Sequence, residues 1–162
     1  MNGNRQKQTI EFRHVTGQNM IEEIKQLFLE YINSLKVDLT FQDLETELKT
    51  LPGKYAPPNG VLILALINGK EAGCVALRKI SDNVCEMKRL YVRDEFRGLG
   101  IGKNLVSKVI KEAKGLNYQY IRLDTLPTMK NAQSLYEMFG FYDIEPYIYN
   151  PIKGTRFLEL KL

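Results

Sequence analysis

The feature that most constrains the fold of this chain is a glycine-rich junction, Arg97-Gly-Leu-Gly-Ile-Gly102, between an apolar segment and a helical pattern. The segment before it, Val84 to Val92, is typical of a strand, and the residues after it are apolar at helical spacing. Such a junction can point several backbone N–H groups at one spot, at the positive end of a helix dipole. Glycines are needed because a Cβ atom would block an approaching anion or strain the backbone. The junction therefore predicts an anion site, most naturally for phosphate.

Three phosphate-loop patterns can be compared with this junction. The Walker A pattern G-x-x-x-x-G-K-[ST] fails because Arg97 stands at its first position and Asn104 at its last. The dinucleotide pattern G-x-G-x-x-G fits Gly98 and Gly100 but ends on a lysine, and the preceding strands look antiparallel. The third pattern, R/Q-x-x-G-x-G/A, is matched at each fixed position by Arg97, Gly100 and Gly102.

Hydrophobic patterning predicts the strands. A continuous apolar run from Val61 to Ile67 ends at the turn signal Asn68-Gly69, and two further apolar segments complete an antiparallel meander. Residues 52–60 contain three prolines and two glycines and are predicted to form a loop. The expected strands are 9–15, 61–67, 71–79, 84–92, 118–125, 141–149 and 155–162.

Start and stop signals place four helices among these strands. The element order is then β-α-α-β-β-β-α-β-α-β-β, which indicates a mixed α/β layout around a central sheet. The helices and their signals are 19–35 with a capping box at Asn19 and Glu22, a helix to about Lys49 capped by Thr40, the stripe Leu105 to Ala113 stopped by Gly115, and a short helix between Thr128 and Gly140.

Length and composition bound the class of protein. We expect one domain over residues 1–162, with a disordered polar tail at 1–7. The 23 Lys and Arg against 19 Asp and Glu give a net charge of +4, which suits an anionic ligand but is weak evidence for nucleic acid. No apolar stretch approaches the ~20 residues of a membrane span, and no apolar leader is visible, so we expect a cytoplasmic protein without a membrane partner.

The cysteines and the single histidine do not indicate a metal site. Cys74 and Cys85 lie outside any metal-ligand spacing, and one histidine is too few for a typical Cys/His zinc site. We interpret both cysteines as small apolar core residues on strands, and His14 as a structural residue.

A second segment supports the third loop pattern. Asn131 precedes Tyr136 by five residues, and a glycine and phenylalanine follow at positions 140 and 141. Together with the loop in its strand–loop–helix setting, this order resembles the two signature regions of the GNAT acetyltransferases, over about Val61 to Phe141. The resemblance implies their α/β fold, the acyl-CoA N-acyltransferase fold: a central, mostly antiparallel twisted sheet of about six to seven strands, flanked by helices.

The resemblance also implies acetyl-CoA as the acyl donor and CoA as a product, with no metal. Backbone groups of the loop would bind the pyrophosphate with help from the charge of Arg97, and Leu90 and Val92 would bind the pantetheine arm. The Leu90 N–H would stabilise the oxyanion, and Asn131 would contact the CoA arm. The loop residues concerned are Gly98, Leu99, Gly100, Ile101, Gly102 and Lys103.

Two side chains match catalytic positions of that family. Glu86 lies eleven residues before Arg97, the spacing at which the histone-acetylating members carry a glutamate base. Tyr136 matches the cofactor-contacting acid that protonates the leaving thiolate. Without the resemblance, Glu86 reads as a surface carboxylate or a partner of Lys88, and Tyr136 as a core tyrosine. The resemblance also implies direct transfer without a covalent enzyme intermediate, and no Cys or Ser stands out as an activated nucleophile.

Two functions from different classes remain open at this point. The first is an acetyl-CoA-dependent N-acetyltransferase that acts on a primary amine of a small molecule or a protein. The second is a non-catalytic acyl-CoA-binding regulatory module on the same fold, because a fold alone does not establish activity. The sequence does not name the amine acceptor. The resemblance implies an acceptor site built from residues 35–60 and 143–155, and a homodimer is also open.

Overall fold

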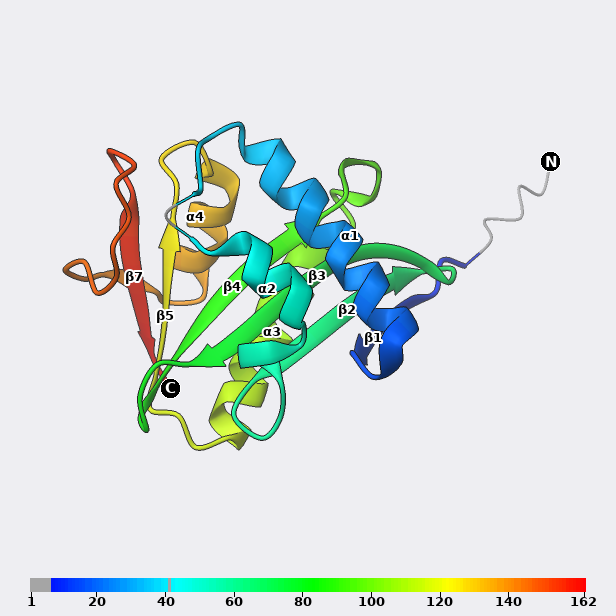
Figure 1. Cartoon of the computed structure of the whole chain (residues 1–162), viewed down its shortest axis with the longest axis horizontal. Coiled ribbons are helices and arrows are strands. Elements are labelled where there is room, and N and C mark those ends of the chain that lie inside the picture. The colour runs from blue at the N-terminus through cyan, green and yellow to red at the C-terminus, as the bar shows by residue number, and fades with distance from the viewer. Residues whose placement is uncertain (1–6, 41) are drawn as a thin grey trace.

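A seven-stranded sheet in the order β1-β2-β3-β4-β5-β7-β6 forms the centre of the computed structural model, which describes residues 7–40 and 42–162 (Figure 1). Neighbouring strands are antiparallel except β4 and β5, which are parallel. The strands are β1 (Ile10–His14), β2 (Val61–Ile67), β3 (Lys70–Lys79), β4 (Val84–Val92), β5 (Tyr120–Thr125), β6 (Tyr142–Asp143) and β7 (Arg156–Lys161). This arrangement confirms the predicted mixed fold with a mostly antiparallel sheet.

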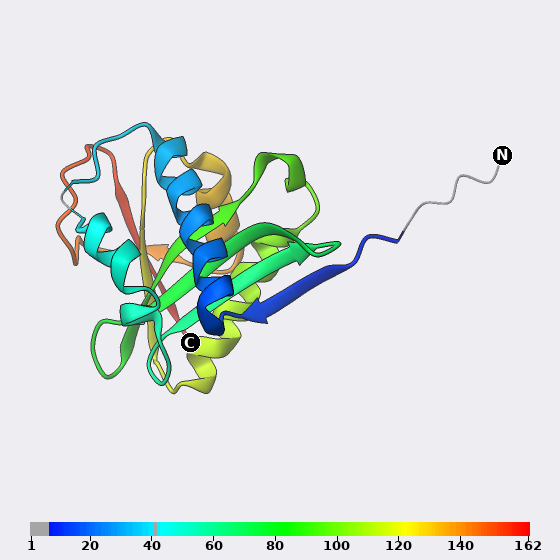
Figure 2. The same cartoon turned by 45° about the vertical axis from the view of Figure 1, so that its right-hand side comes forward.

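Helices cover both faces of the sheet. Helices α1 and α2 lie on one face, and α3 and α4 pack on the other, as the two views show (Figures 1 and 2). Their bounds are α1 (Gly17–Leu35), α2 (Leu44–Thr50), α3 (Ile101–Gly115) and α4 (Lys130–Met138), with short 3₁₀ helices η1 (Gly53–Tyr55) and η2 (Asp94–Phe96). In the described part of the chain, no helix is long and apolar enough to cross a membrane.

The continuous apolar run of β2 is explained by burial on both faces. Ile63 and Ala65 belong to the core on the α3 side, whereas Leu62 and Leu64 belong to the core on the α1 side. Because successive side chains of a strand point to opposite faces, a strand covered by helices on both sides needs apolar residues at every position.

Several predicted boundaries are wrong. Helix α1 begins at Gly17 rather than Asn19, because the Met20 side chain packs against the core and its sulfur accepts from the Thr16 N–H (3.4 Å). Helix α2 is capped by Asp43 rather than Thr40, whose N–H donates to Asp38 in the preceding turn (2.9 Å). The predicted loop 52–60 contains η1. The predicted tail at 1–7 lies outside the described residues except for Lys7.

Later boundaries differ for similar local reasons. Gly115, which was predicted to stop the helix, is instead the last residue of α3, and Asn117 takes the left-handed conformation that follows the helix (φ 65°). Helix α4 has Met129 rather than Thr128 at its N-cap, and the Gln133 side chain holds this end by donating to the Leu126 carbonyl (2.8 Å). The predicted strand 141–149 is reduced to β6, because its later residues leave the sheet edge and fold over it.

The two strands that matter most for the site diverge after a short contact. The parallel pairing of β4 and β5 covers only Val84 to Glu86 on β4 and Tyr120 to Arg122 on β5. Further along, the β3–β4 pairing shifts register, and Arg89 takes a positive φ of 60°. A bulge of this kind bends a strand away from its neighbour. The result is a gap between the C-terminal halves of β4 and β5, visible in Figure 1.

Candidate functional site

The glycine loop turns β4 into α3 through two left-handed residues. Gly98 and Gly100 have φ values of 81° and 78°, and the loop from Arg97 to Gly100 is exposed. Asn104 donates its backbone N–H to the Gly100 carbonyl (3.1 Å), which makes Gly100 the N-cap of α3. The N–H groups before Asn104 have no acceptor within the helix and point out of its positive end. The loop therefore has the form required to hold a phosphate group.

The remaining loop residues position this helix end. A Cβ atom on Gly102 would lie 3.7 Å from Val92 Cγ2 and 3.9 Å from Leu135 Cδ2, so the helix start runs close to β4 and α4. Ile101 is buried in the α3-side core, whereas the side chains of Leu99 and Lys103 are exposed. The group that Leu99, Ile101 and Lys103 have in common for contact with a ligand is therefore the backbone N–H.

Arg97 is at the surface beside the loop. Its guanidinium pairs with Asp94 (3.0 Å) and donates to the Val92 carbonyl (3.3 Å), with 61% of the side chain exposed. Asn131 is also exposed, in the first turn of α4. Both side chains are accessible to a ligand that lies along the loop.

Leu90 and Val92 direct their backbone groups into the gap between β4 and β5. The Arg93 N–H donates to the Ala72 carbonyl (2.8 Å), and Tyr91 pairs with Cys74 of β3. Because backbone direction alternates along a strand, Leu90 and Val92 face the other way, where β5 has already diverged. The backbone groups of Leu90 and the Val92 N–H are thus open to hydrogen bonding by an extended ligand, whereas the Val92 carbonyl accepts from Arg97 Nε (3.3 Å).

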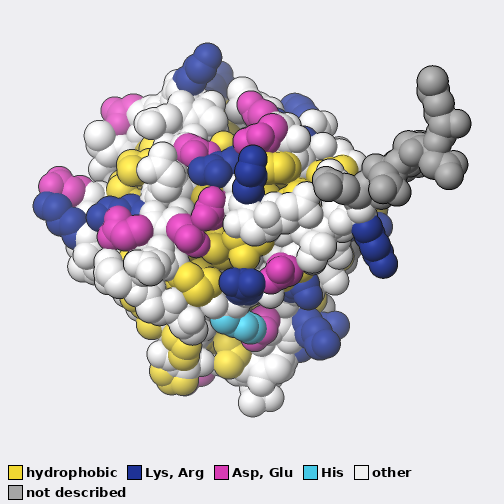
Figure 3. Space-filling view, turned by 90° about the vertical axis from the view of Figure 1, so that its right-hand side faces the viewer, with side chains coloured by type: hydrophobic (Ala, Val, Ile, Leu, Met, Phe, Trp, Pro, Cys, Tyr) yellow, Lys and Arg dark blue, Asp and Glu magenta, His cyan; other side chains and the backbone are white. Residues whose placement is uncertain are grey.

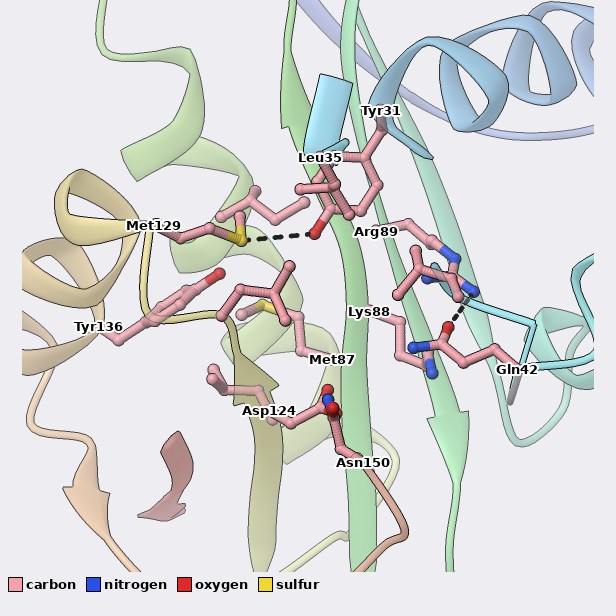
Figure 4. A pocket seen from close by; sticks show the side chains of 14 residues that line it. Tyr31, Leu35, Gln42, Met87, Lys88, Arg89, Asp124, Met129, Tyr136 and Asn150 are labelled. Atoms are coloured by element: carbon pink, nitrogen blue, oxygen red, sulfur yellow. Dashed lines mark hydrogen bonds between the residues drawn. The ribbon is translucent and has the colours of Figure 1, made fainter. Parts of the chain in front are cut away.

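A cavity lies at the point where β4 and β5 diverge (Figure 4). Tyr136 of α4 and Tyr31 of α1 point into it from opposite sides, and Met129 lies between their hydroxyls. Burial raises the pKa of both tyrosines, to about 12 for Tyr31. The Tyr136 hydroxyl makes no hydrogen bond within residues 7–40 and 42–162, so its proton is available to a ligand in the cavity.

A second cavity, of about 330 Å³, adjoins the first. It is bounded by α2, η1 and the loop residues Ile148 and Tyr149. The two cavities share the four polar residues Gln42, Lys88, Arg89 and Asp124. A group entering from one cavity can therefore meet a group entering from the other.

Glu86 lies beneath these cavities and lines neither of them. Its side chain is fully buried, which excludes the reading as a surface carboxylate. One oxygen accepts from Arg78 Nε (2.7 Å) and the other from the Tyr147 hydroxyl (2.5 Å), while Lys88 Nζ is 4.0 Å away. Glu86 thus anchors a polar network that joins β3, β4 and the loop after β6.

Arg89 is a site residue that the sequence analysis missed. It is buried, and its guanidinium bonds Glu47 (3.0 Å) and Gln42 (2.9 Å), which attaches α2 and the segment before it to the bulge of β4. The signal was two consecutive cations, Lys88 and Arg89, in a strand whose only other charged residue is Glu86. Burial lowers the pKa of Lys88, which lines both cavities.

The cysteines and His14 lie outside this site. Cys74 and Cys85 are buried, and burial raises the pKa of the Cys85 thiol to about 12, which fits core residues rather than nucleophiles. His14 is at the surface near the end of α3, on the face shown in Figure 3, and pairs with Glu112 (2.7 Å). Within the described residues, no group of three or more His, Cys, Asp or Glu could hold a metal ion.

Comparisons with known sequences agree on one family. The model of the acetyltransferase (GNAT) family matches residues 21–141. An uncharacterized N-acetyltransferase of Schizosaccharomyces pombe is 41% identical over 88% of each chain, and one of Dictyostelium discoideum is 35% identical over 91% of this chain and 97% of its own. The N-acetylaspartate synthetase of Danio rerio is 36% identical over 68% of this chain and 41% of its own length.

Solved structures agree with the fold. An acetyltransferase from Streptococcus agalactiae superposes with a TM-score of 0.79 at 22% identity, covering 94% of this chain and 98% of its own. A GNAT family acetyltransferase from Elizabethkingia anophelis with acetyl-CoA bound gives a TM-score of 0.63 at 23% identity, with the same coverage of both chains.

Proposed function

Because the chain belongs to the acetyltransferase (GNAT) family, we propose that it transfers an acetyl group from acetyl-CoA to a primary amine. The observation that carries the proposal is the glycine loop at the open end of the β4–β5 gap, with Tyr136 in the adjoining cavity. The loop would hold an anion, and Leu90 of β4, the strand that leads into the loop, lines the cavity that Tyr136 also lines.

The residues along this path suit acetyl-CoA, which supplies an acetyl thioester when bound. The N–H groups of 98–103 would bind the pyrophosphate, and Arg97 would add its charge from the strand end. The backbone groups of Leu90 and Val92 would bind the pantetheine arm in place of a neighbouring strand, and Asn131 would contact that arm. The Leu90 N–H would stabilise negative charge that develops on the acetyl oxygen.

Tyr136 is the proposed general acid. In the transfer, a C–N bond forms and the C–S bond breaks, so the leaving sulfur must gain a proton and the attacking nitrogen must lose one. Burial raises the pKa of Tyr136, which keeps its hydroxyl protonated at neutral pH, as a proton donor requires. The hydroxyl has no competing partner in the described chain, so this proton can go to the sulfur.

Glu86 is the proposed general base, on the strength of its position on β4. Its carboxylate is held by Arg78 and Tyr147, so contact with an acceptor requires Tyr147 to release it or water to carry the proton. Glu86→Gln tests this role against Asp124→Asn, because Asp124 lines both cavities directly. A Glu86→Gln enzyme that keeps its turnover beside an inactive Asp124→Asn enzyme would transfer the base role to Asp124.

Thiol release from acetyl-CoA is the experiment that tests the whole proposal. The purified protein is incubated with acetyl-CoA and a panel of small-molecule amines and lysine-containing peptides; the relatives named N-acetylaspartate synthetase put small molecules first. Amine-dependent thiol release, with the N-acetyl product identified by mass, is the expected result. Binding of acetyl-CoA without release for any amine would contradict it and favour the regulatory module.

A further inference from the structure

Three cations gather on the sheet face where the two cavities meet. Arg78 of β3 and Lys88 and Arg89 of β4 expose only 19%, 12% and 5% of their side chains. A cation removed from water is unfavourable unless anions or hydrogen-bond acceptors compensate it. A cation here that lacks acceptors within the protein is therefore available to an anionic group of a ligand.

The neighbouring carboxylates do not satisfy the hydrogen-bond donors of all three cations. Both oxygens of Glu47 are used, one by Tyr55 and the other by Arg89. Both oxygens of Glu86 are also used, by Arg78 and Tyr147. Lys88 Nζ is 4.0 Å from Glu86, too far for a hydrogen bond, and it has no other acceptor within residues 7–40 and 42–162.

Lys88 thus presents three unused N–H donors at the junction of the cavities. The Nη groups of Arg78 make no hydrogen bond within the described chain either, since only its Nε donates, to Glu86. Arg78 lines the second cavity and Lys88 lines both, so these donors are within reach of a ligand there. The polar group that best matches several convergent cationic donors is a carboxylate.

One carboxylate at the same junction has the opposite character. Asp124 of β5 lines both cavities, and its Oδ2 accepts from the Asn150 amide (3.0 Å). Its other oxygen has no partner in the described part of the chain. Figure 4 shows Asp124 and Asn150 paired at one side of the cavity, with Lys88 across from them. A cationic group of a ligand, such as an ammonium, fits this side.

We propose that the acceptor is a small aminocarboxylate, whose carboxylate binds Lys88 with help from Arg78 and whose ammonium binds Asp124. This inference rests on the proposed function and adds the substrate class. The second cavity, of about 330 Å³, is at the small end of the range for ligand pockets, which suits an amino acid. The ammonium would then lie at the junction, on the side from which the thioester is reached.

Matched acid and amide acceptors test the proposal. Thiol release is measured with L-alanine, β-alanine and L-aspartate, each against its fully amidated counterpart. We expect kcat/KM to favour the acids at least tenfold. The amine of an amino amide is less basic and so more often unprotonated at neutral pH, so amine reactivity alone would favour the amides. Equal or better use of the amides would overturn the proposal.

The Lys88→Met variant provides a second test of the proposal. Its control is Lys111→Met, on the exposed face of α3. Methionine keeps most of the length of the side chain and removes its charge. We expect Lys88→Met to raise KM at least tenfold more for the acids than for the amides, and to leave acetyl-CoA affinity unchanged. The control should change none of these. An equal effect on acids and amides, or no effect on either, would overturn the carboxylate contact.

The two proposals fail in different ways. If peptides or polyamines release thiol but the acids do not, the proposed function stands and the substrate class is wrong. If no amine releases thiol, the proposed function fails, and calorimetric titration of L-aspartate against its diamide in the presence of CoA decides the substrate class alone. Tighter binding of L-aspartate would support it there, and equal binding or none would overturn it.

Discussion

The glycine loop and the polar floor of the cavities are built in opposite ways. The floor consists of the charged and polar residues Glu47, Arg78, Glu86, Lys88, Arg89, Asp124 and Tyr147. The loop is exposed, lies within six consecutive residues and offers backbone groups set by two left-handed glycines. The floor is buried, and its side chains come from α2, β3, β4, β5 and the loop after β6. The comparison teaches that the proposed phosphate site is local in sequence, whereas the proposed acceptor site depends on packing between distant segments.

Breaking the buried ion pair of the floor should have the largest effect. Arg89→Met leaves the partly buried Glu47 without its cation, so we expect the free energy of unfolding to fall by about 3 kcal/mol in urea denaturation, the lower end of the range for a buried pair. Arg97→Met, at the exposed pair with Asp94 beside the loop, should lower it by less than about 1 kcal/mol. Equal losses would mean that the floor is no more structural than the loop.

A substitution in the glycine loop should affect binding rather than folding. Gly100→Val places a β-branched residue at a φ of 78° and a side chain where the anion would lie, and we expect acetyl-CoA affinity to fall at least ~100-fold, or ~2.7 kcal/mol. Gly69→Val, at a φ of 80° in the β2–β3 turn, is the matched control for backbone strain. Both variants should lose similar stability, measured by thermal unfolding. Equal losses of affinity in titration would remove the loop from the cofactor site.

Tyr136 connects the two regions, and its hydroxyl should matter for turnover alone. We expect Tyr136→Phe to lower kcat by ~10–1000-fold without changing acetyl-CoA affinity, because it removes the proton donor but keeps the ring. Stability should hardly change, since the lost hydroxyl has no hydrogen bond in the described chain. Tyr118→Phe, which loses a bond to the Asn59 carbonyl (2.7 Å) away from the site, should keep its kcat. An unchanged kcat in Tyr136→Phe would exclude the acid role.

The smallest expected effect is a pH dependence at the edge of the loop region. Glu30 of α1 accepts two bonds from Arg93, at 2.9 and 2.7 Å, which hold the pKa of this carboxyl below its usual 4.5. A lowered folded-state pKa stabilises the protein above pH 4.5, and this contribution is lost as pH falls through the folded value. Glu30→Gln should therefore lose less stability than the wild type between pH 6 and pH 3, by less than about 1 kcal/mol. Parallel curves for the two proteins would contradict the pairing.

The sequence allowed the loop and much of the fold to be predicted because the signals are local. The spacing of Arg97, Gly100 and Gly102 was enough to identify the loop pattern. The apolar run of β2 predicted a strand, and the structure shows that this strand is buried on both faces. The helix caps were harder, since Asp43 and Thr40 are equally acceptable caps until the turn at Asp38 is known.

The floor could not be predicted because its contacts are distant in sequence. Arg89 and Glu47 are 42 residues apart, and Tyr147 and Glu86 are 61 apart. The composition of the segment around Tyr147 predicts a strand. In the structure the Tyr147 hydroxyl donates to Glu86 and the ring packs on Phe157, so the segment leaves the sheet edge. Pattern and propensity carry no information on such pairings, so Glu86 alone gave no sign that its carboxylate would be fully occupied.

Calorimetric titration of the wild-type protein with acetyl-CoA tests the central claim most directly. The account predicts a Kd in the micromolar range, near −8 kcal/mol, together with thermal stabilisation at saturating ligand. No detectable heat at several temperatures and no shift of the unfolding midpoint would contradict it. The junction from Arg97 to Gly102 would then be a connector between β4 and α3 rather than a phosphate site.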